Sequence, residues 1–197
     1  HYKLPVVKTH LLKYVDLKNA KLEFPVVLKA VGEKIIHKSE LKGVVLNIRD
    51  RNELIKHADE MIKNFKKKDL KLDSFLIQPY IHTKFELLVG GFRDPSFGPM
   101  VMFGTGGKYV EYLEDTVIFS AYLTDFDVDE MINKTKIGKI IQGVRGDSSA
   151  DMNKIKNTII SVAQMMLDNK KITECDLNPL VVSLDNNIFA VDIRIKC

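Results

Sequence analysis

Two stretches of the chain carry apolar residues at the three- and four-residue spacing of an amphipathic helix. The first begins after Asp50, which stands three residues before Glu53 as in a capping box, and the second falls within residues 150–169. The apolar stripes of the two helices are Leu54, Ala58, Met61, Ile62 and Phe65 in the first and Ile155, Ile159, Val162 and Met166 in the second. Each helix is therefore predicted to bury one face.

Short apolar runs rich in β-branched residues predict strands around these helices. The predicted strands are residues 4–8, 25–31, 43–49, 74–81, 84–93, 100–103, 116–123, 172–184 and 188–195. Less regular patterns predict a helix over residues 10–21 and a short helix capped by Asp127. Because strands and helices do not alternate strictly, the pattern favours an α+β fold.

The composition predicts a globular chain with a mild basic bias. Hydrophobic residues make up 45% of the 197 residues, which is enough for one domain or for two small lobes, each with a core. The net charge of +4 comes mostly from scattered lysines, which suits a phosphate-bearing ligand and does not suit a nucleic-acid-binding tail. The dense run at residues 66–68 follows a helical pattern and is interpreted as a solvated helix end.

Cysteine usage favours a reducing compartment, and hydropathy gives no sign of a membrane span. Cys175 and Cys197 show neither a metal-ligand spacing nor a disulfide framework. No apolar run approaches the roughly 18 residues of a membrane span, and the N-terminus lacks a signal-peptide layout. A cytoplasmic protein without a membrane or nucleic-acid partner is expected, and a first residue that is His1 indicates a fragment or a processed chain.

The last two predicted strands form a hairpin whose geometry follows from its turn at residues 185–187. An antiparallel register centred on Asp185 places Asn178 opposite Asp192, and Asp176 opposite Arg194, on one face of the hairpin. The amide and carboxylate oxygens on this face suit Mg²⁺. The same face is also what a solvent-exposed hairpin with an Asp–Arg pair presents, so both interpretations remain open.

Three other residues carry candidate chemistry. Lys29 lies in an otherwise apolar strand, where it either reaches a phosphate group or extends from an edge strand into solvent. His37, in a polar loop beside Lys38, either accepts a phosphoryl group or is a surface residue. Glu86 is either a ligand-binding residue or an ordinary exposed one.

The Gly-rich segments 104–107 and 143–146 allow an anion to approach the backbone, but neither matches a Walker A or dinucleotide motif.

Six segments together resemble the ATP-grasp portion of ADP-forming acetyl-CoA synthetases, with the succinyl-CoA synthetase β-subunit as a more distant relative. In the order expected of the family, they are Pro25-Val-Val-Leu-Lys-Ala-Val, His37-Lys-Ser-Glu, Gln78-Pro-Tyr, Arg93-Asp-Pro-Ser-Phe-Gly-Pro-Met-Val-Met-Phe-Gly, Gly143-Val-Arg-Gly and Asp176-Leu-Asn-Pro-Leu-Val. The likeness runs from about residue 5 to residue 195. It implies that residues 1–197 form an ATP-grasp domain in which two α+β lobes, approximately residues 1–80 and 81–197, hold ATP in a cleft.

The resemblance also implies a role for each candidate residue. Asn178 and Asp192 match metal ligands, His37 matches a histidine that relays a phosphoryl group, and Asp176 matches a residue that orients this histidine. Nucleotide contacts are implied for Lys29, Lys38, Gln78, Tyr80, Ile81 and Glu86.

The implied activity is the reversible reaction of an acid, ATP and CoA to give acyl-CoA, ADP and phosphate, through a phosphohistidine relay. ATP or ADP and Mg²⁺ are the implied cofactors. The implied partner is a CoA-binding α-subunit or domain that carries the first phosphohistidine, in a heterotetramer or a fused-chain dimer. The chain is then a subunit or fragment of a larger synthetase and is incomplete without that partner.

Three departures from the family pattern are visible. Lys42 stands where a glycine is usual, Thr105 where an apolar residue is usual, and Lys84-Phe-Glu replaces Gly-Arg-Glu. The residues implied to bind nucleotide and metal are all present, which favours an active site. The alternatives are a degenerate ATP-grasp module of an acyl-CoA-dependent protein acetyltransferase or regulatory protein, and a scaffolding module of a larger synthetase.

Overall fold

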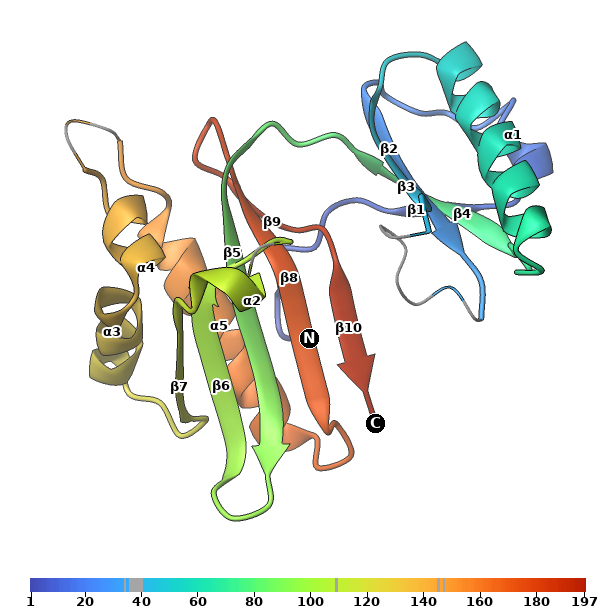
Figure 1. Cartoon of the computed structure of the whole chain (residues 1–197). Helices are drawn as coiled ribbons and strands as arrows, with labels where there is room; N and C mark the ends of the chain where they lie inside the picture. Colours follow the sequence, from blue (N-terminus) through green and yellow to red (C-terminus); the bar gives the residue numbers. More distant parts are fainter. Residues whose placement is uncertain (34, 36–40, 109, 145, 147) are drawn as a thin grey trace. The chain divides into compact units, whose positions relative to one another are not determined.

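A computed structural model describes residues 1–33, 35, 41–108, 110–144, 146 and 148–197. The chain divides into two units, each built around its own antiparallel sheet (Figure 1). The N-terminal unit is Val7–Ile81, and the C-terminal unit is His82–Cys197 together with His1–Val6.

In the N-terminal unit, a four-stranded sheet packs against a single long helix (Figure 1). The strand order is β1-β4-β2-β3, so β2 and β4 are the central strands. The elements are β1 (His10–Leu12), the 3-10 turn η1 (Tyr14–Asp16), β2 (Val26–Val31), β3 (Val44–Ile48), α1 (Arg51–Lys67) and β4 (Ser74–Pro79).

Helix α1 follows the sequence prediction closely. The Asp50 carboxylate accepts a hydrogen bond from the Glu53 N–H at 2.9 Å and caps the first turn. The apolar stripe faces the sheet: Leu54, Ala58, Met61 and Phe65 are buried, and Ile62 packs against the same core. The predicted amphipathic helix is therefore confirmed.

The helix predicted over residues 10–21 is wrong, and so is the strand predicted over residues 4–8. Residues 10–12 form β1, which pairs with β4 through Leu11 and Leu76, and only the short turn η1 follows. Arg51 holds the next segment without a helix, since its guanidinium donates to the carbonyl oxygens of Leu17 at 2.5 Å and Ala20 at 2.6 Å. Pairing with a sheet edge thus replaces the local helical hydrogen bonds.

The C-terminal unit is a six-stranded sheet with helix α5 across one face (Figure 1). The strand order is β10-β8-β5-β6-β7, and β9 also pairs with β8. The strands are β5 (Thr83–Asp94), β6 (Gly98–Thr105), β7 (Thr116–Ser120), β8 (Glu174–Ser183), β9 (Ile188–Ala190) and β10 (Ile193–Lys196). The helices are α2 (Val110–Leu113), α3 (Asp125–Lys134), α4 (Lys136–Ile141) and α5 (Met152–Asp168).

The helices of this unit confirm one sequence prediction and correct another. The stripe Ile155, Ile159, Val162 and Met166 of α5 is fully buried in the core, as predicted. Asp127 does not cap α3. The cap is Thr124, and Asp127 completes the capping box by accepting from the Thr124 N–H at 2.8 Å. The pattern of polar residues identified the helix but placed its start too late.

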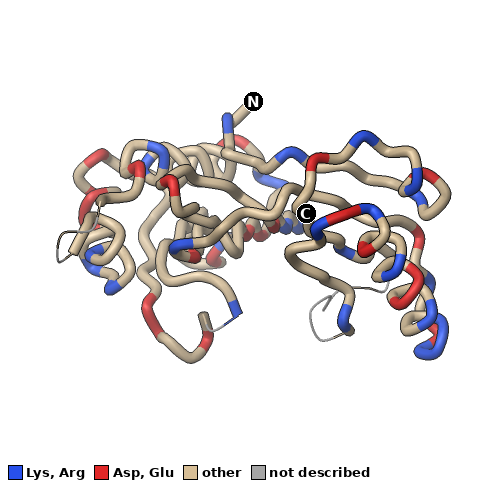
Figure 2. Tube along the Cα trace, turned by 90° about the horizontal axis from the view of Figure 1, so that it is seen from above, with Lys and Arg blue, Asp and Glu red and all other residues tan. Residues whose placement is uncertain are grey.

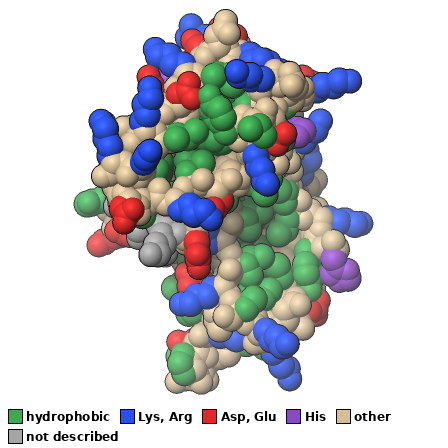
Figure 3. All heavy atoms as spheres, turned by 90° about the vertical axis from the view of Figure 1, so that its right-hand side faces the viewer, with side chains coloured by type: hydrophobic (Ala, Val, Ile, Leu, Met, Phe, Trp, Pro, Cys, Tyr) green, Lys and Arg blue, Asp and Glu red, His purple; other side chains and the backbone are tan. Residues whose placement is uncertain are grey.

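Basic and acidic residues are mixed along the chain (Figure 2) and on the face that the space-filling view shows (Figure 3). Lys and Arg are interspersed with Asp and Glu along the described chain (Figure 2). The face in Figure 3 likewise carries dispersed Lys and Arg side chains among apolar and acidic ones. Within the described residues, no helix is both long and apolar enough to cross a bilayer.

Candidate functional site

The closing hairpin of the C-terminal unit has the register predicted from its turn. Ala190 of β9 pairs with Leu180, and Arg194 of β10 pairs with Asp176. Between these pairs, the backbone N–H of Asn178 donates to the carbonyl oxygen of Asp192 at 3.2 Å. The structure therefore confirms that Asn178 and Asp192 lie opposite one another.

On its other side, strand β8 bulges at Asn178. Leu87 of β5 pairs with Leu180 and Val89 pairs with Leu177, so two residues of β8, Asn178 and the cis-bonded Pro179, lie opposite Leu88 alone. A bulge changes the direction of a side chain relative to a regular strand and is common beside functional sites. The sequence register of the hairpin gave no sign of it, because the bulge is relative to β5, which is distant in the sequence.

The Asn178 side chain contacts the Gly-rich loop that follows β6. The backbone N–H of Gly107 donates to Asn178 Oδ1 at 2.7 Å, and the N–H of Gly106 donates to the carbonyl oxygen of Glu86 at 2.9 Å. Gly107 has a φ of +81°, and a Cβ there would lie only 1.8 Å from Glu86 Oε2. Glu86, this loop and Asn178 thus form one cluster within the C-terminal unit. The sequence singled out Glu86, Asn178 and the Gly-rich segment 104–107, but gave no sign of the hydrogen bond from Gly107 to Asn178.

One carboxylate oxygen of Asp176 is a buried acceptor. Its Oδ1 is buried and has no hydrogen-bond partner among the described residues. Burial raises the pKa of the Asp176 carboxyl above its usual range, the charge of Arg194 opposes the rise, and the charges of Asp192 and Glu174 add to it. Because a buried acceptor without a donor is destabilising, this oxygen is suited to an N–H group brought to it by another segment or ligand.

The oxygen donors of the hairpin fit a magnesium ion. Asn178 and Asp192 offer an amide and a carboxylate oxygen from facing positions, and Mg²⁺ typically takes one or two such ligands and completes its shell with water and phosphate oxygens. Across the described ranges, no three or more His, Cys, Asp or Glu side chains are grouped to hold a metal. The arrangement therefore suits a metal that arrives with a phosphate ligand better than one held in an all-protein cage.

Asp115, which the sequence did not single out as a site residue, is hydrogen-bonded to Thr105 of the same loop. It is 7% exposed and precedes β7. Its carboxylate accepts hydrogen bonds from Thr105 Oγ1 at 2.6 Å and from the N–H groups of Lys136 and Ile137 at 2.6 Å and 2.9 Å. Glu114-Asp115 has the sequence of an ordinary polar turn, which gives no sign that this carboxylate is buried and accepts from three donors.

In the N-terminal unit, Lys29 occupies the middle of the sheet. It lies on β2, paired with Val44 of β3 and Leu76 of β4, and is 8% exposed. The interpretation of Lys29 as an edge-strand residue is therefore wrong. A lysine on a central strand is stable only where its ammonium group reaches a polar partner or the edge of a cleft. Lys29 takes part in an interaction within the chain.

The other predicted residues of this unit lie at the end of β4. Gln78 is 6% exposed, and its Nε2 donates to Thr9 Oγ1 at 3.1 Å. Tyr80 and Ile81 follow the strand and are half-buried, and the Tyr80 N–H donates to the Pro25 carbonyl oxygen at 2.9 Å. The predicted residues His37 and Lys38 lie outside the described residues.

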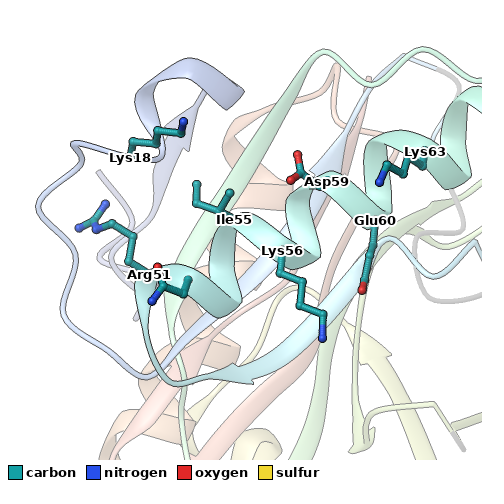
Figure 4. A pocket seen from close by; sticks show the side chains of 8 residues that line it. Lys18, Arg51, Ile55, Lys56, Asp59, Glu60 and Lys63 are labelled. Atoms are coloured by element: carbon teal, nitrogen blue, oxygen red, sulfur yellow. The ribbon is translucent and has the colours of Figure 1, made fainter.

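A shallow depression of about 540 Å³ also runs along α1, lined by residues of both charges (Figure 4). Two of its charged groups are engaged in the fold, since Arg51 donates to two carbonyl oxygens and Asp59 accepts from Tyr14 Oη at 2.6 Å. Among the described residues, none of the predicted site residues lines it. The depression is therefore a feature of the surface of α1 and not the candidate site.

Comparison with known proteins identifies close relatives. The profile of the ATP-grasp domain family matches residues 1–197. The β-subunit of ADP-forming acetate–CoA ligase II from Pyrococcus furiosus is 37% identical, over 98% of this chain and 85% of its own length. ADP-forming acetate–CoA ligase I from Archaeoglobus fulgidus is 38% identical over 87% of this chain. The chain spans 25% of the Archaeoglobus protein and 29% of a 37% identical 4-hydroxybutyrate–CoA ligase from Nitrosopumilus maritimus.

A solved structure shows the same fold. The dinucleotide-forming acetyl-coenzyme A synthetase 1 of Ca. Korarchaeum cryptofilum, in complex with coenzyme A, Ca-AMPCP and HgCl⁺, matches with a TM-score of 0.91 at 36% identity, covering 99% of this chain and 87% of that one. In a second structure of that synthetase, with coenzyme A and Mg-AMPPCP, a phosphohistidine segment points towards the nucleotide binding site, and the TM-score is 0.84.

Proposed function

Because this chain belongs to the ATP-grasp domains of the ADP-forming acetate–CoA ligase family, we propose that it is the nucleotide-binding part of an ADP-forming acyl-CoA synthetase. The reaction joins an acid to CoA while ATP is converted to ADP and phosphate. The observation that carries the proposal is the facing pair Asn178 and Asp192, with the Asn178 side chain held by Gly107 beside Glu86. The hydrogen bond from Gly107 to Asn178 distinguishes this face of the hairpin from one that is only exposed to solvent.

In this proposal, ATP or ADP binds together with Mg²⁺. Asn178 and Asp192 would hold the metal, which neutralises phosphate charge when bound. The ammonium group of Lys29 contacts the phosphates. Lys38, Gln78, Tyr80, Ile81 and Glu86 complete the nucleotide contacts.

Phosphoryl transfer in this proposal runs through His37. An imidazole nitrogen of His37 takes the phosphoryl group from the first phosphohistidine of the partner, whose P–N bond breaks as the P–N bond to His37 forms. His37 then passes the group to ADP, as its own P–N bond breaks and a P–O bond forms to the terminal phosphate of ADP. The unpartnered Oδ1 of Asp176 accepts a hydrogen bond from the other imidazole nitrogen and orients the ring. The buried position of this oxygen supports the role, since no donor reaches it from the part of the chain that the structure describes.

The complete enzyme requires more than these residues. The proposal includes a CoA-binding α-subunit or domain that carries the first phosphohistidine, in a heterotetramer or a fused-chain dimer in the cytoplasm. The acetate–CoA ligase β-subunit of Pyrococcus furiosus supports a separate subunit, and the much longer Archaeoglobus relative supports a fused chain. Without that partner the chain binds nucleotide but does not complete turnover.

Calorimetric titration with ATP and ADP, with and without Mg²⁺, tests the proposal. We expect binding that strengthens with Mg²⁺ and weakens at least tenfold in Lys29→Ala and in Asp192→Ala. The exposed residues Lys170 and Asp16 give matched controls, Lys170→Ala and Asp16→Ala, which should bind as the wild type does. Absence of binding by a chain that circular dichroism shows to be folded would instead support a degenerate or scaffolding module.

A further inference from the structure

The carboxylate of Asp115 joins two segments that are distant in the sequence. One is the start of helix α4, where the N–H groups of Lys136 and Ile137 donate to it. The other is the end of β6, where Thr105 Oγ1 donates to Asp115 Oδ2 at 2.6 Å. Asp115 is 7% exposed, and three hydrogen bonds to its carboxylate make it a rigid anchor.

Thr105 is held by Asp115 through its backbone as well as its side chain. The Thr105 N–H donates to the Asp115 carbonyl oxygen at 2.9 Å. The two segments approach so closely that a Cβ on Gly104 would lie 2.0 Å from that same carbonyl oxygen. The first residue of the Gly-rich loop therefore has little freedom to move.

Two residues further on, the same loop reaches the candidate metal ligand. Gly106 is fixed to the Glu86 carbonyl oxygen, and the Gly107 N–H donates to Asn178 Oδ1 at 2.7 Å. An N–H donor can pair only with the oxygen of an amide, so this bond determines which way the Asn178 amide points. It occupies one lone pair of Oδ1 and leaves the other for a cation.

We propose that Asp115 and Thr105 are positioning residues for Asn178, acting through the loop Gly104–Gly107 and not through contact with the nucleotide. The inference rests on the proposed magnesium–nucleotide function of this unit. Partners that orient a metal ligand in this way typically change metal affinity by about 10- to 100-fold when they are removed. Thr105 stands where the resemblance leads one to expect an apolar residue, so the side-chain bond to Asp115 is a feature of this chain.

The test separates metal affinity from nucleotide affinity. Binding of ADP is measured without metal and across a titration of Mg²⁺ for the wild type, Thr105→Val, Thr105→Ser and Asp115→Asn. Thr105→Val and Asp115→Asn should weaken the Mg²⁺-dependent part of binding by about 10- to 100-fold and leave metal-free ADP binding within about twofold. Thr105→Ser keeps the hydroxyl and should behave as the wild type does. Thr116→Val, an exposed threonine to valine change on β7, is the matched control.

The possible results discriminate between the two proposals. Normal Mg²⁺ dependence in Thr105→Val would overturn the positioning role while leaving the proposed function intact. An equal loss of metal-free and metal-dependent binding would also overturn it, since a general structural defect has that effect. A folded wild-type chain that binds no magnesium–nucleotide would overturn the proposed function itself, and the inference with it.

Discussion

The carboxylate of Glu86 lies where a side chain at position 107 would otherwise be, since a Cβ on Gly107 would be 1.8 Å from Glu86 Oε2. Gly107→Ala must therefore displace Glu86 or the loop, in addition to the strain of an alanine at a φ of +81°. We expect the affinity for magnesium–ADP to fall at least tenfold, because both Glu86 and the bond to Asn178 are disturbed. Isothermal titration calorimetry on the folded variant measures this change.

Gly98 provides the control for the backbone part of this effect. Its φ is +79°, nearly the same as that of Gly107, but a Cβ there would meet no atom within 4 Å. Gly98→Ala should destabilise the fold by about 1 kcal/mol through its backbone alone and leave nucleotide affinity unchanged. Equal affinities in the two variants would show that the contact between Gly107 and Glu86 has no part in binding.

The candidate site was predictable from sequence where its geometry is local. A two-strand register fixed by one turn was sufficient to place Asn178 opposite Asp192, because both lie close to Asp185 in the chain. The bulge at Asn178, the bond from Gly107 and the buried Asp115 all depend on β5, β6 and α4, which are far from the hairpin in sequence. No local pattern reports such contacts.

Arg93, the first residue of a motif used for the family resemblance, has a structural role in this protein. Its Nε donates to the carbonyl oxygen of Ile172 at 2.9 Å, and its Nη2 donates to those of Asn169 at 2.9 Å and Met166. These acceptors lie at the C-terminal end of α5 and just beyond it. We expect Arg93→Lys to lower the free energy of unfolding by about 1–3 kcal/mol, because one ammonium group cannot satisfy all three carbonyl oxygens.

Urea denaturation followed by circular dichroism measures the effect of Arg93→Lys. The exposed Arg49 provides the control, and Arg49→Lys should be within about 0.5 kcal/mol of the wild type. Similar stability of the two variants would contradict the role assigned to Arg93. The ADP affinity of folded Arg93→Lys should be unchanged, because its three acceptors all belong to α5 and the segment that follows it.

The stability of the C-terminal unit should depend on pH through Asp115. Burial of Asp115 opposes ionisation, but the hydrogen bonds from Thr105, Ile137 and Lys136 outweigh it and lower the pKa of this carboxyl below its usual 3.8. A group whose pKa is lower in the folded state stabilises that state above its unfolded pKa, and the contribution is lost as the pH falls through the folded pKa. When the pH is lowered from about 5 to about 2, the free energy of unfolding should therefore fall less in Asp115→Asn than in the wild type.

Denaturant midpoints at several pH values measure this dependence. Asp115→Asn should be less stable than the wild type at neutral pH, and the two curves should converge on acidification. Asp16→Asn, at an exposed position in the N-terminal unit, should keep the wild-type slope. Parallel curves for the wild type and Asp115→Asn would mean that the pKa of Asp115 is not lowered by folding.

The wrong prediction of a helix over residues 10–21 has a different physical reason. Leu11, Tyr14 and Val15 fit a helical spacing of three and four residues, and nothing local distinguishes this segment from a strand followed by a turn. The outcome depends on the free edge of β4, which offers backbone partners to Leu11, and on Arg51, which offers donors to the carbonyl oxygen of Leu17. Both partners lie more than thirty residues further along the chain.

The two cysteines should differ sharply in reactivity towards thiol reagents. Cys175 is 1% exposed on β8, and burial together with the charge of Asp176 raises its pKa to about 12, whereas Cys197 is exposed. Because the thiolate is the reactive form, a disulfide reagent at about pH 8 should modify Cys197 quickly and Cys175 only when β8 opens. Cys197→Ser should consequently show no fast phase, and its slow phase should accelerate in denaturant. Rapid modification of native Cys197→Ser would mean that β8, and with it Asn178, is not held in the sheet as the structure shows.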